Sequence, residues 1–246
     1  ILQTAQSRPP FDDQDNVIDY EVYSREGEDV KVNVVAAKSA LLDSWAQFFN
    51  RRGLKLSALD ADIFGLLNAY MATVEPQDKD ATVAIFKKMS VAFVQDGLFH
   101  SMRAMAGGSL DMVVSKTCMN LGIDSEKCHE LLSTGNLASV DGFSEAEVEA
   151  ALRLAYEDLM AQIDIGIRYF SSTEDSKPLT KILLGGGGAA APGLKEFVAE
   201  HSGIDTDTVN PFKLVPCDSK VFGDGGLSIA LSNIYAPALG LAMRKF

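Results

Sequence analysis

The chain has 246 residues, of which 47% are hydrophobic and 8% aromatic, so it can bury one large core or two moderate ones. Its net charge of −12 and the lack of any Lys/Arg-rich block argue against binding of DNA, RNA or anionic lipid. The three cysteines form no Cys-x-x-Cys motif and the three histidines show no metal-ligand spacing. This pattern predicts a reduced, cytosolic compartment and no zinc site.

The first part of the chain alternates between strand and helix patterns. Residues 16–23 and 30–38 alternate with period two and predict a hairpin. A helix is predicted over 40–52, capped by Ser39, and a strand over 54–62 leads to a helix over 63–72. The helix over 40–52 carries its large apolar residues on one face: Leu41, Leu42, Trp45, Phe48 and Phe49.

A polar segment with a proline, residues 75–81, is the best domain boundary. Strands are then predicted over 82–86, 89–95 and 98–105, with Asp96-Gly97 as a hairpin turn. We therefore expect a first domain over 1–75 and a second over 76–246.

Helices dominate the next segment, and they predict a helical subdomain at about 109–172. Gly122 ends one helix and Asp124 caps the next. Ser144 and Glu147 form a capping-box pattern at the start of a long helix. The uncharged run over 225–243 has nearly the length of a membrane span, but Asn233 and Pro237 favour a buried loop and a terminal helix.

Four consecutive glycines, Gly185 to Gly188, separate the strand pattern over 179–184 from a helix over 193–203. Glycine within an element costs roughly 0.5–1 kcal/mol relative to alanine, so four together need a physical reason. One reason is a tight turn with positive φ, and another is a ligand lying directly on the backbone. The segment fits neither a Walker A motif nor a Rossmann fingerprint.

In its context "ILLGGGGAAAPGL" resembles the adenosine-binding loop of the actin-like ATPase superfamily, and "YAPALGLAMRKF" resembles the terminal helix of that superfamily. Within it the chain is most similar to the PilM family of type IV pilus assembly, which is related to the FtsA division family. The similar segments are collinear over nearly the whole chain: "RPPFDDQDNVIDYEVY", "VNVVAAKSALLDSWAQFFNRRGLKLSALDAD", "GGSLDMVVSKTCMNLGIDSEKC", "IDIGIRYFSS" and "VNPFKLV".

The resemblance implies an α/β protein with the actin-like, ribonuclease H-like bilobed fold, its N-terminal lobe incomplete in this chain. It implies that Gly185, Gly186, Gly187 and Gly188 contact ATP or ADP, with Mg²⁺ present only where a nucleotide binds. His129 matches a family position facing the nucleotide and could contact its base or ribose. The alternative is an ordinary surface or packing histidine.

The chain departs from the family where phosphate is bound. The first phosphate hairpin would lie upstream of Ile1. In the second, Ile85, Phe86 and Lys87 stand where the family has Asp-Ile-Gly, and a family lysine is replaced by Leu132. Lys87 and Lys88 either attract phosphate or, as we favour, are surface lysines of the hairpin. Because phosphoryl transfer needs positioned Mg²⁺ and phosphate donors, we assign no catalytic residue and expect weak or no hydrolysis.

The resemblance further implies a cytoplasmic scaffold held at the inner membrane through a partner, without inserting into the bilayer itself. In the family the partner is the N-terminal cytoplasmic peptide of a PilN-like inner-membrane protein, bound by the small subdomain of the first domain. The corresponding residues here are Val17, Ile18, Tyr20, Val34 and Trp45. For Trp45 a place in the core is the competing interpretation. The alternative functions are an active actin-like ATPase and an FtsA-type division protein.

Overall fold

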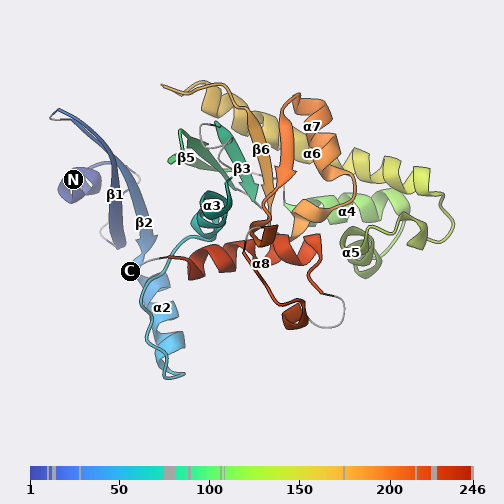
Figure 1. Ribbon diagram of the computed structural model, residues 1–246, viewed down its shortest axis with the longest axis horizontal. Helices are drawn as coiled ribbons and strands as arrows, with labels where there is room; N and C mark the ends of the chain where they lie inside the picture. Colours follow the sequence, from blue (N-terminus) through green and yellow to red (C-terminus); the bar gives the residue numbers. More distant parts are fainter. Residues whose placement is uncertain are drawn as a thin grey trace. The chain divides into compact units, whose positions relative to one another are not determined.

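The computed structural model of the chain is shown in Figure 1 and describes residues 1–9, 11–12, 15–27, 29–74, 81–87, 90–105, 107, 109–173, 175–213, 215–222 and 226–244. The chain forms two compact units. Unit 1 is Ile1–Asp60 and unit 2 is Ala61–Phe246.

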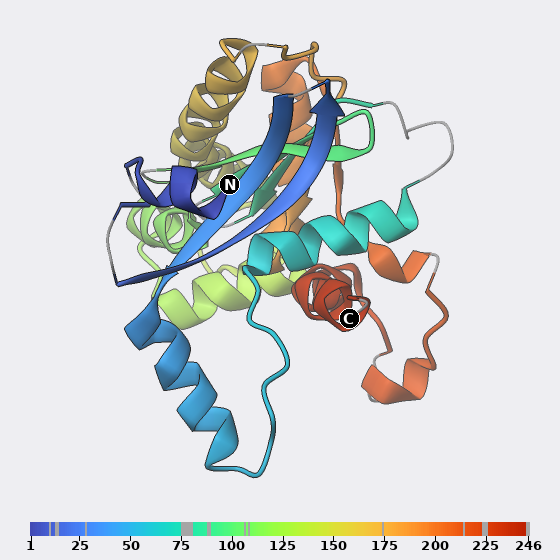
Figure 2. The same cartoon turned by 90° about the vertical axis from the view of Figure 1, so that its left-hand side faces the viewer.

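Unit 1 is built on a two-stranded antiparallel sheet. Strands β1 (Asn16–Glu26) and β2 (Asp29–Lys38) pair along their length, with an irregularity between Val22 and Ser24. A short helix α1 (Leu2–Gln6) precedes the sheet and α2 (Ser39–Asn50) follows it directly. The two strands form the long ribbon drawn in blue in Figure 2. The predicted hairpin is therefore confirmed.

One face of this ribbon is apolar. The register places Ile18 opposite Ala36, and Tyr20 opposite Val34. Yet no residue that the structure describes in unit 1 is buried. A two-stranded sheet is marginally stable in water unless further strands or a helix pack against it. The described residues of unit 1 provide little of this packing.

Two predictions for unit 1 are wrong. Residues 54–61 form no strand, because a strand needs a neighbour to complete its hydrogen bonds and no described residue pairs with this segment. Ser39 does not cap α2 with its side chain. Its hydroxyl instead donates to the backbone oxygen of Asp15, 2.8 Å away, and so connects the start of α2 to the segment before β1.

Unit 2 contains a mixed five-stranded sheet in the order β5-β4-β3-β6-β7. The central strands β3 and β6 are parallel and buried on both faces, which is why their sequences are continuous apolar runs. β3, β4 and β5 form an antiparallel meander, and β7 is parallel to β6. The strands are β3 (Val83–Lys87), β4 (Ser90–Gln95), β5 (Leu98–Ala104), β6 (Lys181–Gly185) and β7 (Asp205–Thr208).

Helices cover both faces of this sheet, as Figure 1 shows. One apolar cluster joins the sheet to α3 and α8, and a larger one joins it to α4, α5, α6 and α7. The helices are α3 (Asp62–Thr73), α4 (Leu110–Leu121), α5 (Ser125–Thr134), α6 (Glu145–Ser171), α7 (Leu194–Ser202) and α8 (Ile229–Ala242). The 3₁₀ turns are η2 (Leu137–Ser139), η3 (Gly187–Ala190), η4 (Pro211–Lys213) and η5 (Ser219–Phe222).

Several local signals in unit 2 are confirmed. Ser144 and Glu147 form the complete capping box at the start of α6. The Asp124 side chain accepts from the amide of Lys127 at the start of α5. Asp96 and Gly97 have φ of 54° and 72°, as a two-residue hairpin turn requires. These contacts depend only on neighbouring residues, so sequence patterns suffice to predict them.

Helices α3 and α8 cross at very short range, and Figure 2 shows them side by side. The crossing is made of glycines. A Cβ atom on Gly240 would overlap the backbone of Gly65, and one on Gly65 would stand 2.5 Å from the backbone oxygen of Pro237. Asn68 donates to the Gly240 carbonyl at 3.4 Å. This contact ties α3 firmly into unit 2.

The two compact units therefore divide between Asp60 and Ala61, before α3. The predicted boundary segment lies later in the chain, and its residues 75–80 are outside the described residues. The family-domain boundary after residue 75 stays a prediction, as does the subdomain at about 109–172, which α4 to α6 span. The uncharged run near the C-terminus forms α8, as expected. Among the described residues, we find no helix with the length and apolar character needed to cross a membrane.

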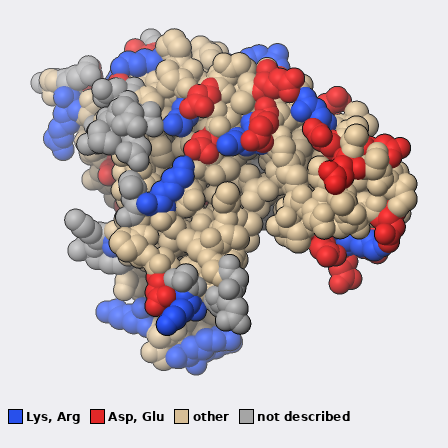
Figure 3. Space-filling view, turned by 45° about the vertical axis from the view of Figure 1, so that its right-hand side comes forward, with Lys and Arg blue, Asp and Glu red and all other residues tan. Residues whose placement is uncertain are grey.

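Acidic side chains gather at one end of unit 2, on the right in Figure 3, where α5 and the start of α6 lie. On the face that Figure 3 shows, acidic side chains are therefore concentrated at this end. The acidic residues of this part of the sequence are Asp124, Glu126, Glu130, Asp141, Glu145, Glu147 and Glu149.

Candidate functional site: the glycine-loop pocket

The four glycines form a sharp turn from β6 into a short 3₁₀ helix. Gly186 has φ +82° and ψ 178°, a backbone conformation that side chains of other residues disfavour. η3 follows at once, and Gly193, with φ +69°, caps the start of α7. The tight-turn explanation for the glycines is therefore confirmed at Gly186.

The neighbouring glycines allow close packing. A Cβ on Gly185 would overlap the side chain of Leu66 in α3. A Cβ on Gly187 would stand 3.2 Å from Ile234 in α8. Gly188 is the exception, because a Cβ there would make only ordinary contact, 3.4 Å from Leu110. Backbone conformation or close packing therefore explains why three of the four positions are glycine. This explanation does not exclude a ligand in the pocket.

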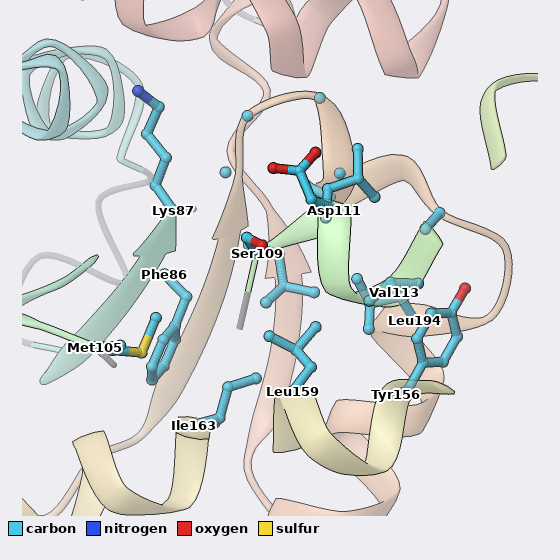
Figure 4. A pocket seen from close by; sticks show the side chains of 18 residues that line it. Phe86, Lys87, Met105, Ser109, Asp111, Val113, Tyr156, Leu159, Ile163 and Leu194 are labelled. Carbon is cyan, nitrogen blue, oxygen red and sulfur yellow. The ribbon is translucent and has the colours of Figure 1, made fainter. Parts of the chain in front are cut away.

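The glycine loop borders a cavity of about 360 Å³, within the size range of small-molecule sites. Figure 4 shows the apolar side chains of Phe86, Leu159 and Ile163 below the loop. They come from β3 and α6, and the N-terminus of α4 forms the opposite wall. The full lining is Phe86, Lys87, Met105, Ser109, Leu110, Asp111, Val113, Tyr156, Leu159, Ile163, Leu184, Gly185, Gly186, Gly187, Gly188, Ala189, Ala191 and Leu194.

Two charged residues line the pocket. Lys87 stands at the end of β3 and its ammonium group pairs with the carboxylate of Asp62, in the first turn of α3. Asp111 lies in the first turn of α4 and forms no ion pair within the described part of the chain. Ser109, the N-cap of α4, makes no capping hydrogen bond with its side chain.

Tyr156 is buried and its hydroxyl donates to the backbone oxygen of Pro192 at 2.8 Å. Burial, with a smaller effect of nearby Cys128, raises the pKa of Tyr156 well above its ordinary value. The Tyr156 hydroxyl therefore stays protonated and keeps its hydrogen bond to Pro192, in the segment that joins η3 to α7. Tyr156 therefore supports the shape of the glycine loop as well as lining the pocket.

The nucleotide contacts expected from the sequence stay predictions, but the structure shows where their residues lie. All four predicted glycines line the pocket. His129 is exposed on α5 and is not among the lining residues, so its nucleotide contact stays a prediction without support from this pocket. Sequence reasoning missed Asp111 and Tyr156, because no local pattern shows that α4 and α6 border the glycine loop.

The expectation that Lys87 is a surface lysine is wrong. Its side chain is only 12% exposed, because the partner carboxylate on α3 and the glycine loop enclose it. A Cβ on Gly186 would stand 3.6 Å from Cγ of Lys87, so the lysine stem lies along the loop. Lys88 falls outside the described residues.

The predicted partner residues all lie in unit 1 and are accessible. Val17 is 49% exposed, Tyr20 39% and Trp45 45%. Ile18 and Val34 are half-buried on the apolar face of the ribbon. The competing interpretation of Trp45 as a core residue does not agree with this exposure.

The pocket suits the base of a nucleotide better than its phosphates. Its apolar walls and bare backbone suit a flat base, whereas the lysine that would hold phosphate is already paired. No cluster of three or more His, Cys, Asp and Glu side chains that could hold a metal ion is found in the described ranges. A Mg²⁺ ion would consequently depend on the phosphates of its nucleotide for most ligands.

Solved structures with a similar fold were identified. A PilM-PilN type IV pilus biogenesis complex matches with a TM-score of 0.78 and 21% identity. The match covers 99% of this chain and 70% of the chain in that structure. The ethanolamine utilization protein EutJ from Carboxydothermus hydrogenoformans matches over 82% of this chain and 60% of its own, with a TM-score of 0.53 and 13% identity. These likenesses establish the α/β fold of the actin-like ATPases, as the resemblance implied.

A diol dehydratase-reactivating factor in nucleotide-free form matches over 98% of this chain and 47% of its own, with a TM-score of 0.51 and 14% identity. None of the curated proteins matches the chain. The family model of the type IV pilus assembly protein PilM, by contrast, matches residues 2–246. The fold, the glycine loop and this match over nearly every residue agree: the chain belongs to the PilM family of type IV pilus assembly proteins.

Proposed function

We propose that this protein is a cytoplasmic scaffold of type IV pilus assembly that binds the N-terminal cytoplasmic peptide of a PilN-like inner-membrane protein. Unit 1 provides the binding surface, and the protein is held at the inner membrane through that partner. The family membership and the likeness to a PilM-PilN complex support this role. The observation that carries it is the apolar face of the ribbon in unit 1, which the described residues leave at least partly exposed.

The geometry of unit 1 suits an extended peptide. Each strand of a two-stranded ribbon has one edge whose backbone groups are not used within the sheet, so a peptide can add as a further strand. Alternate side chains of that peptide would then contact the face formed by Ile18, Tyr20 and Val34. The exposed Trp45 on α2 offers a large aromatic contact of the kind that often dominates binding energy.

The test uses Trp45, the single tryptophan of the chain, as a reporter. A synthetic peptide of the partner's N-terminal cytoplasmic tail is titrated while tryptophan emission and thermal stability are followed. We expect a blue shift on burial of the indole, a rise in Tm, and Kd weakened roughly ten-fold by Tyr20→Ser.

Leu154→Ser is the matched control, because Leu154 is 51% exposed on α6 of unit 2. This variant should bind the peptide like the wild type, and a scrambled peptide should not bind. Unchanged emission and unchanged Tm at saturating peptide would remove the scaffold proposal.

The glycine-loop pocket is, in this proposal, a degenerate nucleotide site. It is supported by Ile85 and Phe86, which are buried side chains where the family has an aspartate and an isoleucine, and by the paired state of Lys87. We expect no phosphate release from Mg-ATP above that of a heat-denatured sample. Steady release that scales with protein concentration would instead favour the active ATPase.

A further inference from the structure

We propose that the glycine-loop pocket accepts an uncharged nucleoside and discriminates against its 5′-polyphosphate, because Asp62 holds the cation that a phosphate would need. The inference rests on the proposed nucleotide site and specifies its ligand. It is carried by three features of the pocket: its apolar walls, the ion pair of Lys87, and the carboxylate of Asp111, which forms no ion pair with another described residue.

The walls favour a flat, uncharged ring. Phe86, Leu159 and Ile163 face the cavity below the glycine loop in Figure 4. Beside Gly188 the side chain of Leu110 would stand 3.4 Å from a Cβ atom, so it adds an apolar surface next to the glycine loop. Burial of an aromatic ring between such surfaces is favourable, and a volume of about 360 Å³ is enough for a base with its sugar.

The cation of the pocket is already neutralised. Among the described lining residues Lys87 alone carries a positive charge, and its ammonium group pairs with Asp62. Its stem lies against Gly186, and Figure 4 shows the side chain extending away from the centre of the cavity. An incoming phosphate would therefore share or compete for an ammonium group whose charge Asp62 already offsets, and the net attraction is reduced.

The remaining charge repels phosphate. Asp111 lies at the mouth of the pocket, where Figure 4 shows its carboxylate above the cavity. The N-terminus of α4 would otherwise attract an anion, but Asp111 in its first turn already supplies negative charge there. A carboxylate and a phosphate in one site disfavour each other. Asp111 is exposed, so water screens part of this repulsion, and the ion pair of Lys87 is the larger contribution to the discrimination.

The same polar groups suit the sugar of a nucleoside. The Asp111 carboxylate accepts hydrogen bonds, and the side chain of Ser109 is not used to cap α4. Neighbouring hydroxyl groups on a ribose provide donors for both. The chemistry therefore selects a neutral molecule with an aromatic ring at one end and hydroxyl groups at the other.

Isothermal calorimetry with adenosine and with ATP, each with and without Mg²⁺, tests the inference on the full chain. For the wild type we expect adenosine to bind at least roughly ten-fold more tightly than ATP. Asp62→Asn frees Lys87 and should tighten ATP binding roughly ten-fold, leaving adenosine unchanged, because a charged partner strengthens a phosphate contact. Lys87→Met in the Asp62→Asn background should abolish that gain.

Two further variants keep the result interpretable. Asp96→Asn removes the same charge from another aspartate-lysine pair, with Lys177, at the β4-β5 turn, and should leave both affinities unchanged. Asp111→Asn should also improve ATP binding without involving α3. Circular dichroism and a thermal melt establish that each variant is folded.

The outcomes separate this inference from the proposed nucleotide site. ATP binding as tight as adenosine in the wild type, or an unchanged ratio in both Asp62→Asn and Asp111→Asn, overturns the inference and leaves the site standing. Binding of neither ligand overturns both. Peptide binding by unit 1 is independent of all three results.

Discussion

The two units of this chain contain the same kinds of side chains but pack them differently. Unit 2 covers its sheet on both faces, and Phe170 on α6 is fully buried against Phe93. Unit 1 has an amphipathic helix with comparable aromatic residues, yet Trp45 on α2 is 45% exposed. The difference teaches that an apolar pattern predicts a surface that packs against something. The packing partner can be another element of the same chain, as in unit 2, or another molecule, as we propose for unit 1.

A large loss of stability is expected where α3 crosses α8 in unit 2. Gly240→Ala should destabilise unit 2 by about 3 kcal/mol, because its Cβ would overlap the backbone of Gly65, which cannot rotate away. For a unit of this size that loss lowers Tm by roughly 10 °C. Thermal unfolding followed by far-UV circular dichroism measures it.

Gly107→Ala serves as the control, since a Cβ at that position would make ordinary contact with two flexible side chains, Gln162 at 3.7 Å and Met112 at 4.0 Å. It should change Tm by less than a third as much. Equal stability of the two variants would contradict the close crossing of α3 and α8.

A matched pair of aromatic truncations compares the units directly. Phe170→Ala should cost about 3–5 kcal/mol, because it leaves a cavity beside Phe93. Trp45→Ala should cost about 1 kcal/mol or less, because the indole is 45% exposed and contacts only neighbouring rings of α2 such as Phe49 among the described ring contacts. Denaturant unfolding followed by circular dichroism gives both values. Similar losses for the two variants would mean that Trp45 belongs to a packed core.

The smallest effect concerns the thiols. Burial, together with nearby Cys118, raises the pKa of Cys128 to about 12, whereas Cys217 is exposed. Because the thiolate is the reactive form, iodoacetamide at pH 8 should label Cys217 first and Cys128 only after unfolding. Raising the pH from 8 to 9 should not make Cys128 reactive, since its pKa lies far above that window. Peptide mapping by mass spectrometry follows each site, and early labelling of Cys128 would contradict its burial.

Sequence patterns predicted the parts of the fold that depend on neighbouring residues. The capping box of Ser144, the cap of Asp124 and the turn at Asp96 each need contacts over a few residues only. The buried strands β3 and β6 were predicted because both their faces are apolar. The glycine loop was placed correctly because its sequence fixes a sharp turn wherever the fold puts it.

Features that depend on distant residues were not predictable in this way. The strand expected over 54–62 fails because pairing requires a neighbour that no local pattern reveals. The state of Lys87 depends on Asp62, which lies 25 residues away in sequence. Asp111 reaches the pocket only because α4 begins beside β3 and β6. Which charges face a pocket of this kind depends on contacts between residues far apart in sequence, so it can be determined only once the fold is known.

Hydrogen exchange with and without the partner's cytoplasmic peptide tests the central claim most directly. In the free protein we expect amides of β1 and β2 to exchange much faster than those of β3 and β6, because only the latter lie in a packed sheet. Saturating peptide should slow exchange in β1 and β2 and leave β3 and β6 unchanged. Protection confined to unit 2, or no protection in either unit, would contradict the assignment of unit 1 as the binding surface.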